Sequence, residues 1–261
     1  MAVQSDLLLR AAATASSALF PHRCVLCRRF DVDAGRPLCP ECLPRVEKDR
    51  QAPACPTCGS DAPPAGVTEG RCRRCRGRRP PVSRAVRVGA YGHALGPLVL
   101  SYKYDADSIA AAMLGQWLTE AVTRASQLAD LPSLMDVDAV VPVPTTAWRR
   151  LRSRLHVPSE LSRVLARRLD RPLAPALRRV RGGPHQIGLT LEQRIDNVRG
   201  AFKLSRGAAL PGARILLVDD VSTTGATLSE CARVLRRGGA RWVCAAILAR
   251  AATAMEAMLG V

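Results

Sequence analysis

The chain has 261 residues, enough for one main domain and a smaller appendage. Its 39 lysine and arginine residues outnumber 22 acidic residues, and the net charge of +17 favours a polyanionic partner, although an arginine-rich composition also arises in a GC-rich genome. No run of eighteen apolar residues is present, which excludes a transmembrane helix of ordinary length. At the N-terminus, Arg10 interrupts an apolar stretch over residues 7–20, so we expect a short amphipathic helix there and not a cleaved signal peptide.

Eight of the ten cysteines form four CxxC pairs in the first third of the chain. The pairs are Cys24 and Cys27, Cys39 and Cys42, Cys55 and Cys58, and Cys72 and Cys75. Two pairs complete a tetrahedral four-thiolate site, so four pairs predict two Zn²⁺ ions, both structural because thiolates fill every coordination position. Sequential pairing is the simplest arrangement, and the spacing also allows a crossed one. So many thiols outside a disulfide scaffold indicate a reducing, cytoplasmic location.

A redox role is the competing interpretation of these cysteines. It is disfavoured because the pairs lie among proline, glycine and arginine and not at the end of a strand that leads into a helix. Arginines around the last pair, such as Arg73 and Arg74, have the alternative task of neutralising the negative charge of a four-thiolate zinc site. Pro80 and Pro81 then mark a break, which divides the chain into a zinc module over 1–80 and a main domain over 81–261.

The main domain alternates predicted strands and helices. In chain order we expect a strand over 85–90, a helix capped by Asp107 or Ser108, a strand over 138–143, a helix over 159–169, a strand over 215–218, a helix over 227–237 closed by glycine, and a strand over 241–249. This order predicts an α/β fold with a largely parallel sheet, and ligands bind at the carboxyl ends of such strands. Cys231 and Cys244 fall in the last helix and strand, where we expect small buried hydrophobic residues.

The strand Ile215–Val218 ends in two adjacent carboxylates, Asp219 and Asp220. The loop that follows consists of Val221, Ser222, Thr223, Thr224, Gly225, Ala226 and Thr227. Its glycine lets backbone N–H groups converge, its hydroxyls add donors, and the next helix adds its dipole, so the loop is a candidate phosphate cradle. The carboxylates suit the vicinal hydroxyls of a sugar or a Mg²⁺ ion. Ordinary helix capping requires no such double aspartate, so the pattern favours a phosphorylated ribose as ligand.

The stretch Ile215–Thr227 resembles the signature of type I phosphoribosyltransferases that binds 5-phosphoribosyl 1-pyrophosphate (PRPP), and it matches at all thirteen positions. The resemblance implies that Asp219 and Asp220 hold the ribose 2′- and 3′-hydroxyls. It also implies that the loop Thr223–Thr227 holds the 5′-phosphate and that Mg²⁺ accompanies PRPP.

A longer series of motifs resembles one branch of these proteins, the competence-associated ComF family. The series consists of the cysteine-rich N-terminus, SYKY at 101–104, VVPVP at 140–144, QIGL at 186–189, RIDNVRGAF at 194–202 and the PRPP loop. The resemblance implies that Lys103 lies near the pyrophosphate and that Arg194 and Asn197 pack beside the active site. It also implies proteins of the competence machinery as partners.

The chain departs from the family pattern at three places. The usual Gly-Phe-Asn-Gln run is replaced by Leu155, His156, Val157 and Pro158; Lys103 is followed by Tyr104, Asp105, Ala106 and Asp107 in place of a glycine and basic residues; and Gly183 stands where a threonine is expected. These changes remove an amide pair and several cations from the acceptor and pyrophosphate sides. PRPP binding is therefore a firmer expectation than turnover.

Three functions follow as hypotheses: a phosphoribosyltransferase, a protein that binds single-stranded DNA, and a PRPP sensor without catalysis. The DNA hypothesis depends on the segment 149–181, in which eleven arginines accompany only two acids. The candidate contacts begin with Arg149, Arg150, Arg152 and Arg154 and continue with Arg163, Arg167, Arg168, Arg171, Arg178, Arg179 and Arg181. A solvated helix face is the alternative, and the two acids are too few to pair with it.

Overall fold

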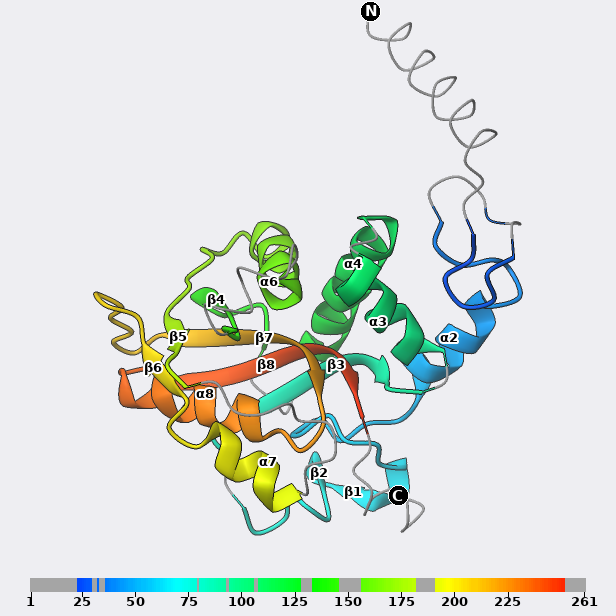
Figure 1. The fold of residues 1–261 in the computed structure, drawn as a ribbon. Helices are drawn as coiled ribbons and strands as arrows, with labels where there is room; N and C mark the ends of the chain where they lie inside the picture. Colours follow the sequence, from blue (N-terminus) through cyan, green and yellow to red (C-terminus); the bar gives the residue numbers. More distant parts are fainter. Residues whose placement is uncertain are drawn as a thin grey trace, which may run out of the picture.

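A computed structural model describes residues 23–29, 32, 36–78, 80–92, 94–105, 108–127, 133–145, 156–181 and 191–251 (Figure 1). The helices are α2 (Leu43–Gln51), the 3₁₀ helix η1 (Pro64–Gly66), α3 (Leu95–Asp105), α4 (Ser108–Ser126), α6 (Val157–Arg168), α7 (Leu191–Val198) and α8 (Ala226–Arg237). The strands are β1 (Val67–Thr68), β2 (Arg71–Cys72), β3 (Arg84–Ala90), β4 (Ala139–Pro142), β5 (Leu177–Arg179), β6 (Phe202–Leu204), β7 (Arg214–Ser222) and β8 (Trp242–Arg250). The N-terminal helix expected over 7–20 and the candidate cap Asp107 lie outside the described residues.

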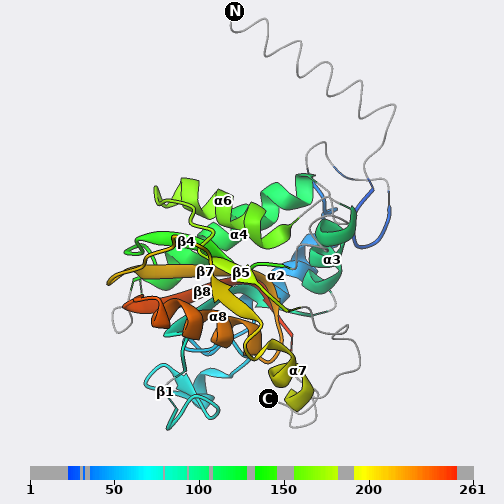
Figure 2. The same cartoon turned by 60° about the vertical axis from the view of Figure 1, so that its left-hand side comes forward.

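A four-stranded parallel sheet forms the centre of the main domain, in the order β3-β8-β7-β4. Helices α3, α4 and α6 cover one face, and α8 covers the other (Figures 1 and 2). Alternate residues of β7 face opposite sides: Leu216 belongs to the core beneath α4 and α6, while Leu217 belongs to the core beneath α8. Because both faces are covered, the strand reads as a continuous apolar run, and the predicted α/β fold with a parallel sheet is confirmed.

Strand β7 is longer than the sequence pattern predicts. It continues past Val218 to Ser222, because β8 runs alongside it as far as the pair Ser222 and Arg250. Asp219 and Asp220 therefore lie within the strand, and the connection to α8 shrinks to residues 223–225. The polar residues gave no local signal for this extension, since their pairing depends on a strand that follows later in the chain.

Helix α3 was not expected from the sequence. Gly96 and Pro97 interrupt its first turn, although proline is tolerated at such a position. A contact from the zinc module organises this turn: the Asp49 carboxylate of α2 accepts hydrogen bonds from the backbone N–H groups of Ala94 at 3.2 Å and Leu95 at 2.8 Å. Helix α3 thus takes its N-terminal cap from another helix.

Helix α2 lies so close to β3 and to the segment after it that the residues at the contact, Gly89 and Gly92, must lack side chains. A Cβ atom added at Gly89 would lie 2.6 Å from the Asp49 carbonyl oxygen, and one added at Gly92 would lie 2.3 Å from its carboxylate. Beside this contact, the Arg50 guanidinium stacks over the ring of Trp117, 4.2 Å from its centroid, and pairs with Glu120 at 2.8 Å. The zinc module is therefore packed against the main domain through α2.

Substitution of Asp49 by alanine tests this cap. We expect the free energy of unfolding to fall by about 1 kcal/mol, as for the loss of an N-cap residue, while Asp49→Asn retains most of the stability. Urea unfolding followed by circular dichroism measures the difference. Asp196→Ala, which removes an exposed aspartate 3.6 Å from Arg199, is the matched control and should cost little. An equal loss in both alanine variants would contradict the assigned role of Asp49.

Candidate functional site

Asp219 and Asp220 lie near the carboxyl end of β7 and are only 8% and 9% exposed. The Lys103 side chain, near the end of α3, donates a hydrogen bond through Nζ to Asp220 Oδ2 at 2.7 Å. The fold therefore brings together the three residues that the sequence predicts as candidate catalytic groups, although Lys103 precedes Asp220 by 117 residues.

Backbone hydrogen bonds orient both carboxylates. Asp219 Oδ1 accepts from the N–H of Asp220 at 2.9 Å, and Asp220 Oδ1 accepts from the N–H of Val221 at 2.7 Å. The backbone N–H of the residue that follows thus orients each aspartate, and carboxylate oxygens are suitable acceptors for a ligand hydroxyl or ligands for a cation.

The two aspartates differ in their affinity for a proton. Burial raises the pKa of Asp219 well above its ordinary value, and the charge of Asp220 adds to the effect. Burial would also raise the pKa of Asp220, but the charge and hydrogen bond of Lys103 outweigh it and hold this pKa below its ordinary value. For Lys103, burial lowers the pKa, and the attraction of Asp220 more than reverses this. Asp220 is thus the ionised partner of Lys103, and a bound cation would favour ionisation of Asp219 as well.

Substitution of Lys103 by methionine should lower the free energy of unfolding by an amount that depends on pH. A carboxylate whose pKa is depressed in the folded state contributes stability above its unfolded pKa of about 3.9, and this contribution disappears as the pH falls through the folded value. We expect the free energy of unfolding to fall by about 1 kcal/mol at pH 7 and by less below pH ~4. The figure at pH 7 is modest because the lysine is partly exposed to solvent. Urea unfolding at both pH values measures it, with the exposed Lys48→Met as control. A loss that is independent of pH would refute the pairing.

A tight turn connects the carboxylates to helix α8. Gly225 adopts a left-handed conformation with φ of 76° and precedes the helix, and the Thr224 hydroxyl accepts a hydrogen bond from the Ala226 N–H at 3.1 Å. Val221 and Ser222 lie in β7, Thr223 completes the turn with Thr224 and Gly225, and Ala226 and Thr227 begin α8. A strand, a glycine turn and a helix N-terminus in this order suit an anionic ligand.

Some of the other predicted positions lie within the described residues and some do not. The candidate DNA contacts Arg149, Arg150, Arg152 and Arg154 lie outside the described residues, as do Leu155, Gly183 and Gln186. Asn197 lies half-buried in α7. Val157 and Pro158, which replace part of the family's amide-containing run, are buried in the first turn of α6. At these two positions the chain presents apolar packing in place of amide groups.

Sequence reasoning overlooked two polar residues that contact this region. Asp49 caps the helix that carries Lys103, and Arg250, buried at the end of β8, donates to the Ser222 hydroxyl at 3.3 Å. The available signal for Arg250 was a single arginine at the end of the apolar run 242–249. No local pattern distinguishes Asp49.

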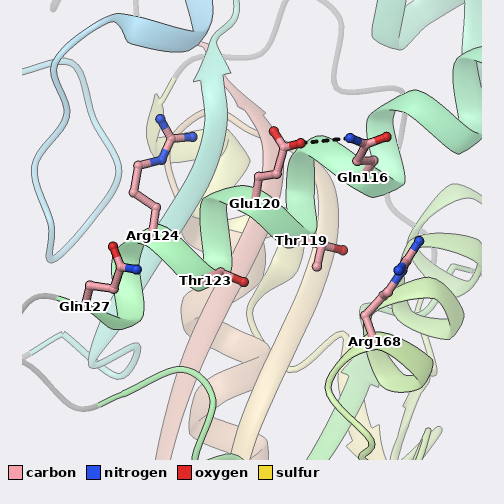
Figure 3. Close-up of a pocket in the computed structure, with 7 residues that line it drawn as sticks. All are labelled: Gln116, Thr119, Glu120, Thr123, Arg124, Gln127 and Arg168. Atoms are coloured by element: carbon pink, nitrogen blue, oxygen red, sulfur yellow. Dashed lines mark hydrogen bonds between the residues drawn. The ribbon is translucent and has the colours of Figure 1, made fainter.

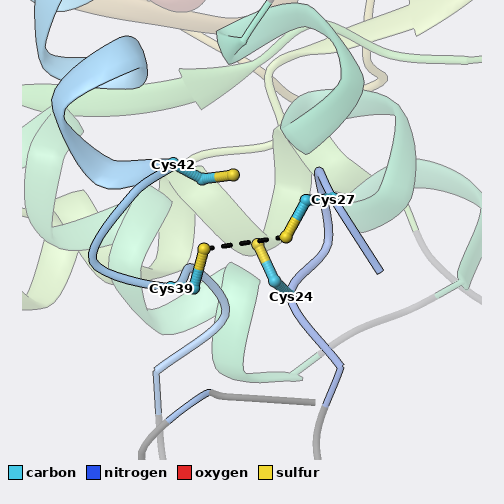
Figure 4. A group of neighbouring side chains, drawn as sticks. All are labelled: Cys24, Cys27, Cys39 and Cys42. Carbon is cyan, nitrogen blue, oxygen red and sulfur yellow. Dashed lines mark hydrogen bonds between the residues drawn. The ribbon is translucent and has the colours of Figure 1, made fainter. Parts of the chain in front are cut away.

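The eight clustered cysteines form two groups, and the grouping is sequential. The first comprises Cys24, Cys27, Cys39 and Cys42 (Figure 4), and the second comprises Cys55, Cys58, Cys72 and Cys75. Within each group all sulfur atoms lie within 4.8 Å of one another, and Sγ–Sγ distances of 3.6 Å and 3.8 Å occur between Cys27 and Cys39 and between Cys58 and Cys72. A tetrahedral zinc–thiolate site requires a separation of roughly 3.8 Å. Both groups are therefore suited to a structural zinc ion.

Proton affinities within the first group also favour a metal. Burial raises the pKa of the Cys42 thiol to about 12, with neighbouring thiols adding to the effect. Burial also raises the pKa of the Cys24 thiol, but backbone hydrogen bonds, including that of Cys27, outweigh this effect and bring the pKa to about 6. Four thiols in so small a space cannot all ionise without a cation, and a divalent ion supplies the missing positive charge.

A groove of about 550 Å³ lies between α4 and α6 (Figure 3). The residues that line it have polar side chains and include Glu120 and Arg124 from α4 and Arg168 from α6. The Gln116 amide donates to Glu120 at 2.9 Å within this groove. None of the candidate PRPP or zinc residues lines it, so the groove is separate from the chemistry of the β7 site.

Two segments of the chain match families of known proteins. Residues 15–79 match the family model of the double zinc ribbon domain, and residues 159–257 match that of the phosphoribosyl transferase domain. Competence protein F of Haemophilus influenzae is 31% identical over 234 residues, which cover 89% of this chain and 98% of the relative. The chain belongs to the ComF family. The resemblance carried by the sequence motifs is thereby confirmed.

Other comparisons extend the description of this ComF-family chain. DNA utilization protein YhgH of Salmonella typhi is 33% identical over 224 residues, 85% of this chain and 94% of the relative. A solved orotate phosphoribosyltransferase from Aeropyrum pernix is 18% identical over 59% of this chain and 78% of its own, with a TM-score of 0.33. Within the described part of the chain, no helix combines the length and apolar character needed to cross a membrane.

Proposed function

We propose that this ComF-family protein binds PRPP with Mg²⁺ at the carboxyl end of β7 and acts in DNA uptake during natural transformation or in nucleotide metabolism. The observation that carries the proposal is the buried pair Asp219 and Asp220, with Lys103 bonded to the second carboxylate and the glycine turn directly after the strand. A phosphorylated ribose matches this arrangement, because it offers vicinal hydroxyls to the carboxylates and an anion to the turn.

Each part of the site has a separate role in this proposal. Asp219 and Asp220 accept hydrogen bonds from the ribose hydroxyls, while the turn and the start of α8 hold the 5′-phosphate. Lys103, hydrogen-bonded to Asp220 at 2.7 Å, supplies a positive charge for the pyrophosphate. When bound, Mg²⁺ supplies charge that neutralises the pyrophosphate oxygens.

Transfer would break the bond between the ribose anomeric carbon and the pyrophosphate oxygen and form a bond from that carbon to an acceptor nitrogen, which loses a proton. The protein contributes positioning and charge stabilisation and needs no covalent nucleophile. Buried Val157 and Pro158 replace amide groups on the acceptor side. This substitution favours PRPP binding over turnover, and a PRPP sensor is the corresponding outcome without catalysis.

Contact with single-stranded DNA is the second proposed activity. It is supported by five exposed arginines in and around α6 and β5. They are Arg167 and Arg168 on α6, Arg171 after it, Arg178 on β5 and Arg181 after that strand. Such a surface tracks a phosphate backbone, so affinity should fall steeply with added salt. The relative YhgH carries the name DNA utilization protein, which agrees with this assignment.

The proposed function is tested by calorimetric titration of the zinc-loaded protein with PRPP and Mg²⁺, followed by a pyrophosphate-release assay with the common nucleobases. Binding with release identifies a transferase and its acceptor. Binding without release identifies a sensor or a DNA-handling protein that retains the pocket. Absence of binding would overturn the PRPP proposal. Fluorescence anisotropy with a labelled oligonucleotide at two salt concentrations tests the DNA contact separately.

A further inference from the structure

Arg250 connects the candidate PRPP site to the second cysteine group. This residue is 4% exposed at the end of β8. Through one guanidinium nitrogen it donates to the Ser222 hydroxyl at 3.3 Å and to the backbone carbonyl of Cys58 at 3.4 Å. Ser222 immediately precedes the turn 223–225, and Cys58 belongs to the second cysteine group. A single buried cation therefore contacts both the anion-binding segment and the zinc ribbon.

The guanidinium also lies against the turn itself. The β7–β8 register pairs Ser222 with Arg250, and a Cβ atom added at Gly225 would lie 3.3 Å from the same arginine nitrogen. Gly225 has a positive φ of 76°, which a residue with a side chain rarely adopts. Because the turn is packed this closely on Arg250, displacement of the arginine would displace the turn.

The Cys58 carbonyl is itself held by the ribbon. The segment around it is closed by backbone hydrogen bonds from Gly59 to Cys55 at 2.8 Å and from Cys55 to Ser60 at 2.9 Å. Both Cys55 and Cys58 contribute sulfurs to the second group. A zinc ion bound there would anchor the two ends of this segment and thereby the position of the carbonyl that Arg250 contacts.

We propose that Arg250 is a positioning residue that couples the second zinc site to the phosphate-binding turn. Zinc at the second cysteine group fixes the Cys58 carbonyl, that carbonyl fixes the guanidinium, and the guanidinium fixes Ser222 and the turn. Arginine suits this task because its planar guanidinium presents several donors in fixed directions, whereas lysine offers a compact point charge. The role of the turn in binding phosphate rests on the proposed function; its mechanical connection to the ribbon does not.

Arg87 provides a matched control. It is a buried arginine of β3 that contacts the same ribbon, donating to the carbonyls of Ala52 at 3.2 Å and Pro53 at 3.3 Å and to the Asp61 carboxylate. None of these partners belongs to the turn. Arg87→Met therefore removes contacts at Ala52, Pro53 and Asp61 while leaving the Arg250 side chain and the four cysteines of the second group in place.

Hydrogen–deuterium exchange tests the connection without any ligand. In the zinc-loaded full chain, peptides that contain residues 222–227 should exchange about tenfold faster in Arg250→Met than in the wild type, with partial recovery in Arg250→Lys. They should be unchanged in Arg87→Met. Zinc removal from the wild type should produce the same increase, and it should add little in Arg250→Met. Unchanged exchange after both changes, or equal increases in the two methionine variants, would overturn the coupling.

Zinc release in the presence of PRPP tests the coupling from the other site. Coupling between sites is reciprocal, so PRPP with Mg²⁺ should slow chelator-induced release of one of the two zinc ions in the wild type and in Arg87→Met, but not in Arg250→Met. Bound PRPP without protection would refute the coupling and leave the proposed function intact. Lack of PRPP binding combined with the expected exchange pattern would refute the proposed function and support the coupling.

Discussion

Replacement of Asp219 and Asp220 together by asparagine should weaken PRPP binding at least a hundredfold while leaving the affinity for single-stranded DNA nearly unchanged. Both side chains are buried, and Asp220 pairs with Lys103 at 2.7 Å. Asparagine nearly preserves the shape but removes the negative charge, and each hydrogen bond to a charged group contributes roughly 1.5–3 kcal/mol. The DNA contacts are proposed for a different set of residues, so the two activities should separate.

Calorimetry with PRPP and Mg²⁺ measures the first effect, and fluorescence anisotropy with a labelled oligonucleotide measures the second. Asp138→Asn is a suitable control. Asp138 lies just before β4 and pairs at 2.8 Å with Arg214, the first residue of β7. This pair is therefore at the opposite end of β7 from the site. It should retain PRPP binding. Circular dichroism establishes that each variant is folded. Equal losses of PRPP and DNA affinity in a folded double variant would show that the sites are not separate.

Loss of zinc should have the largest effect on the stability of the N-terminal module. Apparent binding free energies of structural zinc are about 10–16 kcal/mol, more than a small ribbon gains from its own core. Sequential grouping makes a specific prediction for double variants. Cys24→Ser with Cys39→Ser alters one group and should retain one zinc ion per chain, whereas Cys24→Ser with Cys55→Ser alters both groups and should retain none.

Elemental analysis of the purified variants measures the zinc content, and thermal unfolding measures the loss of stability. Cys231→Ser is the control, because this cysteine is buried in α8 outside both groups and its replacement should leave two zinc ions bound. If the first CxxC pair shared a site with the third, the results of the two double variants would be exchanged; if it shared a site with the fourth, neither variant would retain zinc. Either result would refute the sequential grouping.

Local patterns were sufficient for much of this protein. The CxxC spacing indicated two four-thiolate sites, since two residues between thiols direct both sulfurs to one ion. The alternation of apolar strands with helices indicated the parallel sheet, and the run around Asp219 and Asp220 indicated a site at its carboxyl edge. These features depend on residues close together in the chain, where spacing alone constrains geometry.

Tertiary packing decided how the site is assembled. Lys103 meets Asp220 across 117 residues because α3 packs beside β8 and β3, and α3 itself begins at a cap supplied by Asp49. Arg250 meets Cys58 across 192 residues, since the segment that carries the second cysteine group lies against the end of β8. Such contacts join separate elements, so no local periodicity encodes them. The sequence determined which chemical groups are present and where each parallel strand ends, whereas only packing determined which charges become buried partners and how the zinc module meets the site.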